Sequence, residues 1–127
     1  DLSLTRTNRN ERACQMELLA KERGEMLVIR TTQDRIDAAS AIQFKDRMRD
    51  ITGASAATRV VLDMSNVAFL DSSGLGAVVA VLKALAPDRT LELSGLTPTV
   101  QKVFRLTRMD TIFTIHDAVP DGLRNVG

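Results

Sequence analysis

Residues 60–85 contain the feature that most restricts how this chain can fold, because a strand pattern, a polar hexapeptide and a helical pattern follow one another there. Val60-Val61-Leu62 is typical of a strand that is covered on both faces. From Leu75 onward, apolar residues recur at helical spacing, which predicts a helix that ends before Pro87. Between the two patterns, Asp71-Ser72-Ser73-Gly74-Leu75-Gly76 supplies the Asp and Ser residues that cap helices. This order indicates an α/β fold.

Strand and helix patterns continue to alternate along the rest of the chain. They predict strands at residues 15–20, 26–30, 59–63, 91–93 and 112–115. They predict helices from Asp37 to Gly53, from Ser72, from Thr97-Pro98 and over 118–126. Two strands followed by alternating helices and strands predict a mixed β-sheet of about five strands with helices packed on it. We expect residues 1–14 to be a flexible lead or an expression remnant, and residues 15–127 to form one domain.

Composition argues against several classes of function. The chain has 17 basic and 16 acidic residues, so no field of one sign steers it toward nucleic acid or an anionic membrane. It has no Trp, no Tyr and only four Phe, whereas single-stranded nucleic acid is bound by stacking on aromatic side chains. Cys14 is the only cysteine, which rules out a disulfide within one chain and fits a reducing cytoplasm. The longest apolar run, residues 75–82, is too short to span a bilayer.

Ser72 is expected at the exposed start of a helix, where another protein can reach its hydroxyl. As a catalytic nucleophile it would need a base within hydrogen-bond reach. The only histidine, His116, lies near the end of the last predicted strand, and no Gly-x-Ser-x-Gly elbow is present. A phosphate on Ser72 would instead add a charge of about −1.5 to −2, which makes this residue a candidate switch. Capping of the helix alone is the simpler alternative.

The surrounding glycines and aspartates give no stronger sign of a cofactor or metal site. Gly74 and Gly76 supply only two of the three glycines of a dinucleotide fingerprint, and Asp71 would repel a pyrophosphate. Asp37, Asp63 and Asp71 could in principle gather around Mg²⁺, but helix capping and turn formation explain carboxylates at these places. We therefore expect no metal, no cofactor and no catalytic residue.

Three segments carry a resemblance to a known family. The segment Val61-Leu62-Asp63-Met64-Ser65-Asn66-Val67-Ala68-Phe69-Leu70-Asp71-Ser72-Ser73-Gly74-Leu75-Gly76 resembles the signature of the STAS domain, above all that of bacterial anti-sigma factor antagonists. Residues 100–107, followed by Met109, Ile112 and Phe113, agree with it, and Arg35-Ile36-Asp37-Ala38 agrees in part. The resemblance covers roughly residues 16 to 120 and implies the same mixed sheet with helices packed on it.

The resemblance also implies a function. The unphosphorylated chain would bind an anti-sigma factor that is also a serine kinase, and would thereby free a sigma factor. In such antagonists the serine directly after the Asp of the motif is phosphorylated, which is Ser72 here, and a phosphoserine phosphatase reverses the modification. The chain would be a cytoplasmic phosphoprotein in transcription regulation, without enzymatic activity. The partner-binding surface would consist of Asp37, Asp71, Ser72, Ser73, Gly74 and Leu75.

A second function stays open within the same resemblance. The chain could be the STAS subunit of a lipid ABC transport system, or a STAS domain excised from an anion transporter. The sequence also departs from the family pattern at Asp34, because a Gly usually stands two residues before Ile36. Asp34 adds a negative charge beside the expected partner surface, so this departure affects which partner is recognised more than it affects the fold.

Overall fold

The fold is built on a five-stranded sheet in the order β1-β2-β4-β6-β7. The computed structural model describes residues 17–119 of the chain. The strands of this sheet are β1 (Leu18–Arg23), β2 (Met26–Thr31), β4 (Arg59–Asp63), β6 (Thr90–Ser94) and β7 (Thr114–His116). β1 runs antiparallel to β2, and every other neighbouring pair is parallel. The predicted mixed sheet of about five strands is therefore confirmed.

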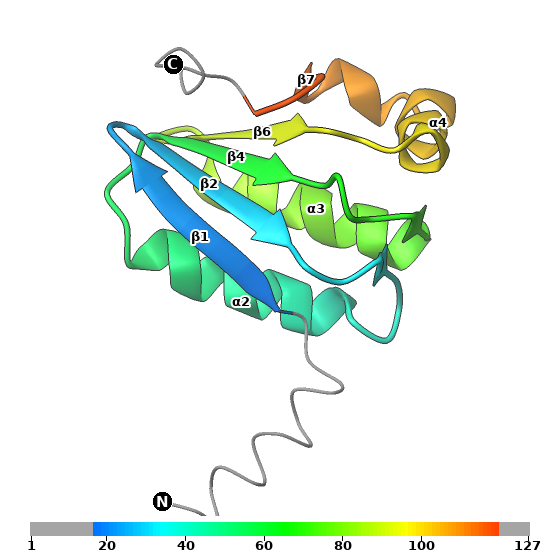
Figure 1. Cartoon of the computed structure of the whole chain (residues 1–127), viewed down its shortest axis with the longest axis horizontal. Coiled ribbons are helices and arrows are strands. Elements are labelled where there is room, and N and C mark those ends of the chain that lie inside the picture. The colour runs from blue at the N-terminus through cyan, green and yellow to red at the C-terminus, as the bar shows by residue number, and fades with distance from the viewer. Residues whose placement is uncertain (1–16, 120–127) are drawn as a thin grey trace, which may run out of the picture.

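Two helices, α2 (Ala41–Gly53) and α3 (Ser72–Leu85), cover one face of this sheet (Figure 1). α4 (Pro98–Leu106) and a short 3-10 helix, η1 (Met109–Thr111), follow β6 in the chain. Figure 1 shows α2 and α3 behind the sheet in this view, while α4 lies beyond the end of β6. None of the helices found between residues 17 and 119 has the length and apolar character needed to cross a bilayer.

The core lies between the sheet and these two helices. Side chains of a strand alternate between its two faces, so every second residue points at the helices. Six aliphatic residues from the three central strands do so, each at most 2% exposed: Leu27, Ile29, Val60, Leu62, Leu91 and Leu93. Phe44 and Met48 of α2 meet them and are fully buried, as their spacing predicts. Each such side chain contributes about 1.5–3 kcal/mol of hydrophobic stabilisation.

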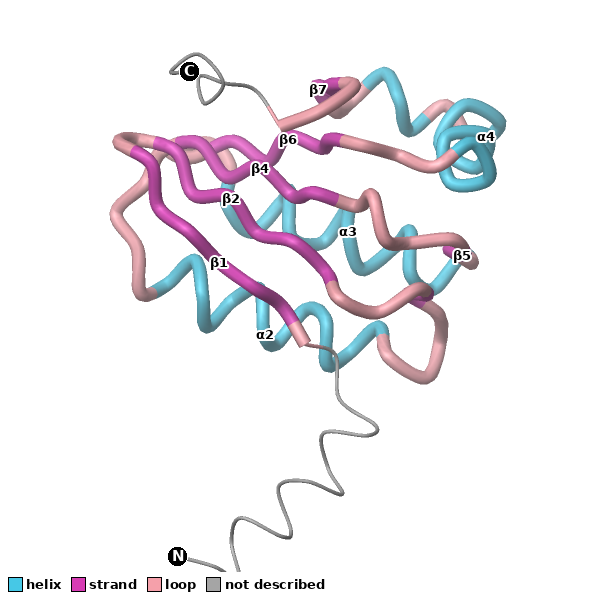
Figure 2. The backbone as a smooth tube through the Cα atoms, in the orientation of Figure 1, coloured by secondary structure: helices cyan, strands magenta, loops and turns pink. Residues whose placement is uncertain are grey.

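A second, two-stranded sheet was not predicted from the sequence. β3 (Arg35–Ile36) pairs in parallel with β5 (Phe69–Leu70), with Arg35 opposite Phe69 and Ile36 opposite Leu70. Ile36 and Leu70 are buried in the core, whereas Arg35 and Phe69 are exposed. Figure 2 shows β5 among the loops that follow β2 and β4, at the end of the sheet where these parallel strands finish.

The structure corrects predicted boundaries at several elements, including α2, which begins at Ala41 rather than at Asp37. β1 begins at Leu18 and continues to Arg23, three residues beyond the predicted end at residue 20, while residues 15 and 16 of the predicted strand lie outside the described residues. The hairpin turn is only Gly24-Glu25, with Gly24 in the left-handed region at φ +65°. The last strand covers residues 114–116 rather than 112–115. Ala118 and Val119 are not helical, and the rest of the helix predicted over 118–126 lies outside the described residues, as does the predicted lead at 1–14.

Candidate functional site

The loop from β5 to α3 places Ser72 at the first residue of α3. Asp71 is the N-cap: its Oδ1 accepts a hydrogen bond of 2.9 Å from the Gly74 amide, and its carbonyl accepts one of 2.8 Å from the Leu75 amide. Ser72 and Ser73 are both exposed. The Ser72 hydroxyl is therefore carried by a well-capped helix end that other molecules can reach.

Asp71 also ties this helix end to the loop between β3 and α2. Its Oδ2 accepts a hydrogen bond of 3.2 Å from the Ala38 amide, and its own amide donates one of 3.4 Å to the Ile36 carbonyl. A Cβ at Gly74 would collide with that same carbonyl, so only glycine allows the two backbones to approach this closely. Gly76 has open space around its Cα, and the close approach depends on Gly74 alone.

Asp37 stabilises the loop between β3 and α2, to which Asp71 is hydrogen-bonded. Its Oδ1 accepts hydrogen bonds of 3.1 Å from the Ala39 amide and 3.3 Å from the Ser40 hydroxyl. Its Oδ2 lies 3.1 Å from Nε of Arg35. The helix itself begins at Ala41, so Asp37 stabilises the turn that leads into α2 rather than the first helical residue.

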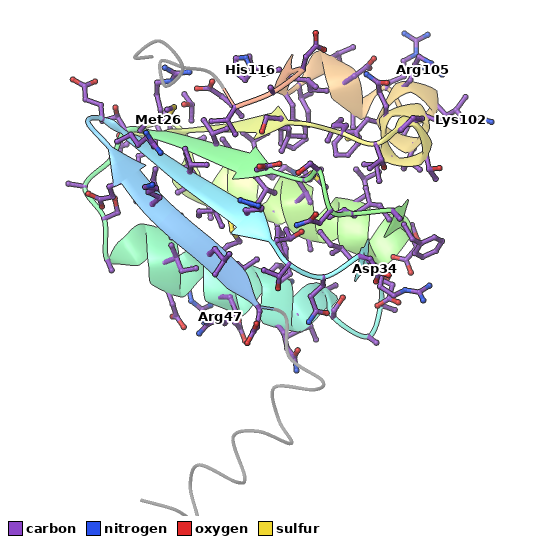
Figure 3. All side chains as sticks on the ribbon, viewed as in Figure 1. Met26, Asp34, Arg47, Lys102, Arg105 and His116 are labelled. Carbon is purple, nitrogen blue, oxygen red and sulfur yellow. The ribbon has the colours of Figure 1, made fainter. Side chains whose placement is uncertain are left out.

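Asp34 anchors the two loops through its backbone. Its carbonyl accepts hydrogen bonds from the amides of Ala68 at 2.7 Å and Phe69 at 3.2 Å. Among residues 17–119 the only non-glycine residue with positive φ is Arg108, so the turn at Asp34 requires no glycine. Figure 3 shows Asp34 at the site end of the sheet and Met26 at the opposite end.

The structure brings the predicted partner-binding residues to this one end of the sheet: Asp37, Asp71, Ser72, Ser73, Gly74 and Leu75. Leu75 packs into the core and is 9% exposed, so little of its side chain reaches the surface.

The third aspartate considered for a metal site, Asp63, makes its contacts elsewhere, accepting a hydrogen bond from the Ser65 amide at 3.0 Å. Within residues 17–119, no three His, Cys, Asp or Glu side chains are placed to hold a metal ion.

Two exposed residues of the site were missed in the sequence. The guanidinium carbon of Arg35 lies 4.9 Å from the centroid of the Phe69 ring, in a cation–π arrangement. Phe69 keeps 41% of its surface exposed although it is large and apolar. Strands of two residues show no periodicity, so the sequence held no signal for this pairing.

A separate ionic cluster lies on the face of the sheet opposite α2 and α3. Nε and Nη2 of Arg59 bind the two carboxylate oxygens of Glu92 at 2.9 and 2.7 Å. Nε2 of His116 lies 2.8 Å from Oε1 of the same carboxylate. These contacts, chiefly the hydrogen bonds from Arg59, lower the pKa of Glu92 from 4.5 to about 2, although burial opposes the shift. His116 thus joins β7 to β6 and β4, and it does not meet Ser72 in this cluster.

Fold and site together define a small α/β domain whose strand-end loops present an exposed serine at a capped helix start. The profile of the STAS domain family matches residues 17–122, and the chain belongs to this family.

Solved structures agree in fold. An anti-sigma factor antagonist from Mycobacterium paratuberculosis is 22% identical with a TM-score of 0.74, over 87% of this chain and 93% of that one. SpoIIAA, an anti-sigma factor antagonist and Bacillus cell fate determinant, is solved in unphosphorylated and phosphorylated forms. The unphosphorylated form is 25% identical with a TM-score of 0.56, over 81% of this chain and 88% of that one. The murine anion transporter Slc26a9 is 19% identical with a TM-score of 0.61, over 68% of this chain but 14% of the transporter.

Proposed function

We propose that this chain is an anti-sigma factor antagonist controlled by phosphorylation of Ser72. Its unphosphorylated form binds an anti-sigma factor that is also a serine kinase and so frees a sigma factor, in the cytoplasm. The observation that carries the proposal is the exposed Ser72 at the start of α3, directly after the Asp71 cap. SpoIIAA, which shares the fold, exists in both a phosphorylated and an unphosphorylated form.

The kinase supplies the chemistry, and this chain supplies the acceptor. Oγ of Ser72 forms a bond to the γ-phosphorus of ATP, the bond from that phosphorus to ADP breaks, and the hydroxyl proton passes to a base of the kinase. The chain itself needs no cofactor and has no catalytic role. A phosphoserine phosphatase removes the phosphate by hydrolysis and restores the binding form.

The phosphate acts at the interface rather than on the fold. At a helix N-terminus an anion gains about 0.3–1 kcal/mol from the helix dipole, so the modified domain stays folded. Against a docked partner, the same charge beside Asp71 and Asp37 adds repulsion and desolvation. A loss of about 4 kcal/mol in binding corresponds to roughly a thousandfold loss of affinity, which is enough for a switch.

A transporter-associated STAS domain is the second candidate. The observation that favours it is the shared fold with part of the anion transporter Slc26a9. In this case the exposed surface would hold transporter subunits, Ser72 would serve only as part of the helix start, and its replacement would leave binding unchanged.

Pull-down from a lysate of the native host, read by mass spectrometry, separates the two functions. The baits are Ser72→Ala, Ser72→Glu and, as a matched control on the neighbouring exposed hydroxyl, Ser73→Ala. We expect a serine-kinase-like protein to be retained by the two Ala baits and lost with Ser72→Glu. The purified partner should then phosphorylate wild type and Ser73→Ala with ATP, but not Ser72→Ala. Retention of the same transporter subunits by all three baits would instead support the second candidate.

A further inference from the structure

The outer side of the small β3–β5 sheet carries one cation, Arg35. In the parallel register Arg35 stands opposite Phe69, and both side chains face outward while Ile36 and Leu70 face the core. The guanidinium of Arg35 lies over the Phe69 ring at 4.9 Å. It also binds Oδ2 of Asp37 through Nε at 3.1 Å. Within residues 17–119 these are its side-chain partners, so its two terminal nitrogens keep their capacity to donate.

Arg35 and Ser72 belong to loops that are hydrogen-bonded to each other. The carboxylate of Asp37 holds Arg35, and the next residue, Ala38, donates its amide to Asp71 at 3.2 Å. Ser72 follows Asp71 directly. Ser72 therefore belongs to the same junction of two loops as the ion pair of Arg35.

The charges at this junction are unbalanced. Asp34, Asp37 and Asp71 supply three carboxylates, and Arg35 supplies the one cation of residues 34–38 and 69–76. A phosphate on Ser72 would add a group of charge about −2 with three acceptor oxygens, which a planar guanidinium binds more strongly than it binds one carboxylate. The existing pair is exposed, 55% at Arg35 and 22% at Asp37, and exposed ion pairs add little net stability.

We propose that phosphorylation of Ser72 draws the Arg35 guanidinium away from Asp37 and the Phe69 ring and onto the phosphate. The modification then does more than add charge, because it also removes a cation–π pair from the surface and leaves the Phe69 ring uncovered. Exposed Arg and aromatic side chains are the residue types that contribute most to protein interfaces. A partner that contacts this pair would lose its contact with the guanidinium and would meet a bare aromatic ring instead. This inference rests on the proposed phosphorylation of Ser72.

The test needs no kinase and no partner. Phosphoserine is installed at position 72 by genetic encoding, and the second pKa of the phosphate is measured by phosphorus NMR. Wild type is compared with Arg35→Gln and with Arg23→Gln. Arg23 pairs with Met26, which Figure 3 shows at the far end of the sheet, so this control makes the same change of net charge at a distance. We expect Arg35→Gln to raise the phosphate pKa by about 0.4–0.8 pH units, the value for unit charges about 4–8 Å apart in water. Arg23→Gln should leave it unchanged.

A second NMR measurement follows Phe69, whose ring Arg35 covers in the unmodified protein. The ring resonances of Phe69 should move on phosphorylation in wild type, and this movement should be absent in Arg35→Gln. Equal phosphate pKa values in wild type and Arg35→Gln, or equal shifts in the two Gln variants, would overturn the proposal. An unchanged Phe69 ring in phosphorylated wild type would overturn it as well. None of these results would affect the proposed kinase switch, which is decided separately by the Ser72 baits.

Discussion

Replacing Glu92 of β6 by Gln keeps the shape of the side chain but removes the negative charge that binds side chains of the two neighbouring strands, β4 and β7. In the structure the carboxylate binds Arg59 of β4 through two hydrogen bonds of 2.7 and 2.9 Å. It also meets His116 of β7 at 2.8 Å. An amide at this position can accept from only one of its two terminal atoms, so one donor of Arg59 would face the NH₂ group. We therefore expect Glu92→Gln to lower the free energy of unfolding.

The size of this effect follows from the pKa of Glu92. A shift from 4.5 to about 2 corresponds to about 3 kcal/mol of preferential stabilisation of the ionised carboxylate in the folded state. The Arg59 side chain is 44% exposed, so solvent screens part of the interaction. We expect the variant to be less stable than wild type by about 1–3 kcal/mol at neutral pH.

The pH dependence gives the sharper check. Because the folded-state pKa of Glu92 is depressed, its stabilisation is fully present above the unfolded value near 4.5 and is lost as the pH falls from there toward about 2. The Gln side chain does not titrate. The stability difference between wild type and variant should therefore be largest above about pH 5 and should shrink toward zero near about pH 2. Urea unfolding followed by circular dichroism at several pH values measures this difference directly.

A control on an exposed ion pair separates this effect from a general loss of charge. Asp46 pairs with Arg49 one helical turn away on the surface of α2, and both side chains are largely exposed. Asp46→Asn should change the stability by less than about 0.5 kcal/mol at every pH. The reasoning would be refuted if Glu92→Gln behaved like Asp46→Asn, or if its deficit stayed constant from about pH 5 down to about pH 2.

Three further predictions concern the backbone contacts around the site and α2. Gly74→Ala should lower the free energy of unfolding by about 2–3 kcal/mol, because its Cβ would collide with the Ile36 carbonyl. Gly76→Ala, which has open space for a Cβ, should raise it by about 0.5–1 kcal/mol. Thermal or urea unfolding measures both changes, and changes of the same sign would contradict the geometry. Asp71→Ala removes the N-cap bond of α3 and the bond to the Ala38 amide, so urea unfolding should show a loss of about 1–2 kcal/mol. Arg89→Ala removes the side-chain hydrogen bonds to three backbone carbonyls at the end of α2 and in the loop after it, those of Thr52, Ser55 and Ala57. The same assay should show a loss of about 2–3 kcal/mol, and a neutral result would mean that water replaces all three bonds.

Hydrophobic spacing was sufficient to predict most elements of the fold. Ala41, Phe44 and Met48 recur at helical spacing and fall on one buried face of α2, and Thr97 caps α4 with Pro98 at its first position. These predictions succeed because each depends on residues that are neighbours in the sequence.

The errors arose where the structure depends on contacts between distant segments. The predicted strand stops at residue 20 and omits the polar end of β1, Lys21 to Arg23, because an edge strand that is exposed on both faces shows no alternation. The pairs Arg35–Phe69 and Glu92–His116 depend on the register of parallel strands, which no local pattern specifies. A helix cap is local, so the sequence predicts Asp71 and Ser72 at the start of α3, whereas the pairing of Arg35 with Phe69 joins two segments that are far apart in the sequence.

The two ionic clusters have different roles. Glu92 with Arg59 and His116 stabilises the fold, whereas Arg35 with Asp37 lies at the surface, where its contacts can change. The carboxylate of Glu92 is buried and holds three strands together, so the loss of its charge is expected to reach the whole fold. The ion pair of Arg35 with Asp37 is open to solvent and joins residues only two positions apart in the chain, so its partners can be exchanged without disturbing the core. Asp71 accepts a hydrogen bond from the first turn of α3 through one carboxylate oxygen and one from the loop before α2 through the other, and it thereby keeps the helix start in place. A phosphate added next to such a fixed point changes the surface and leaves the scaffold intact, which is the property that a reversible binding switch requires.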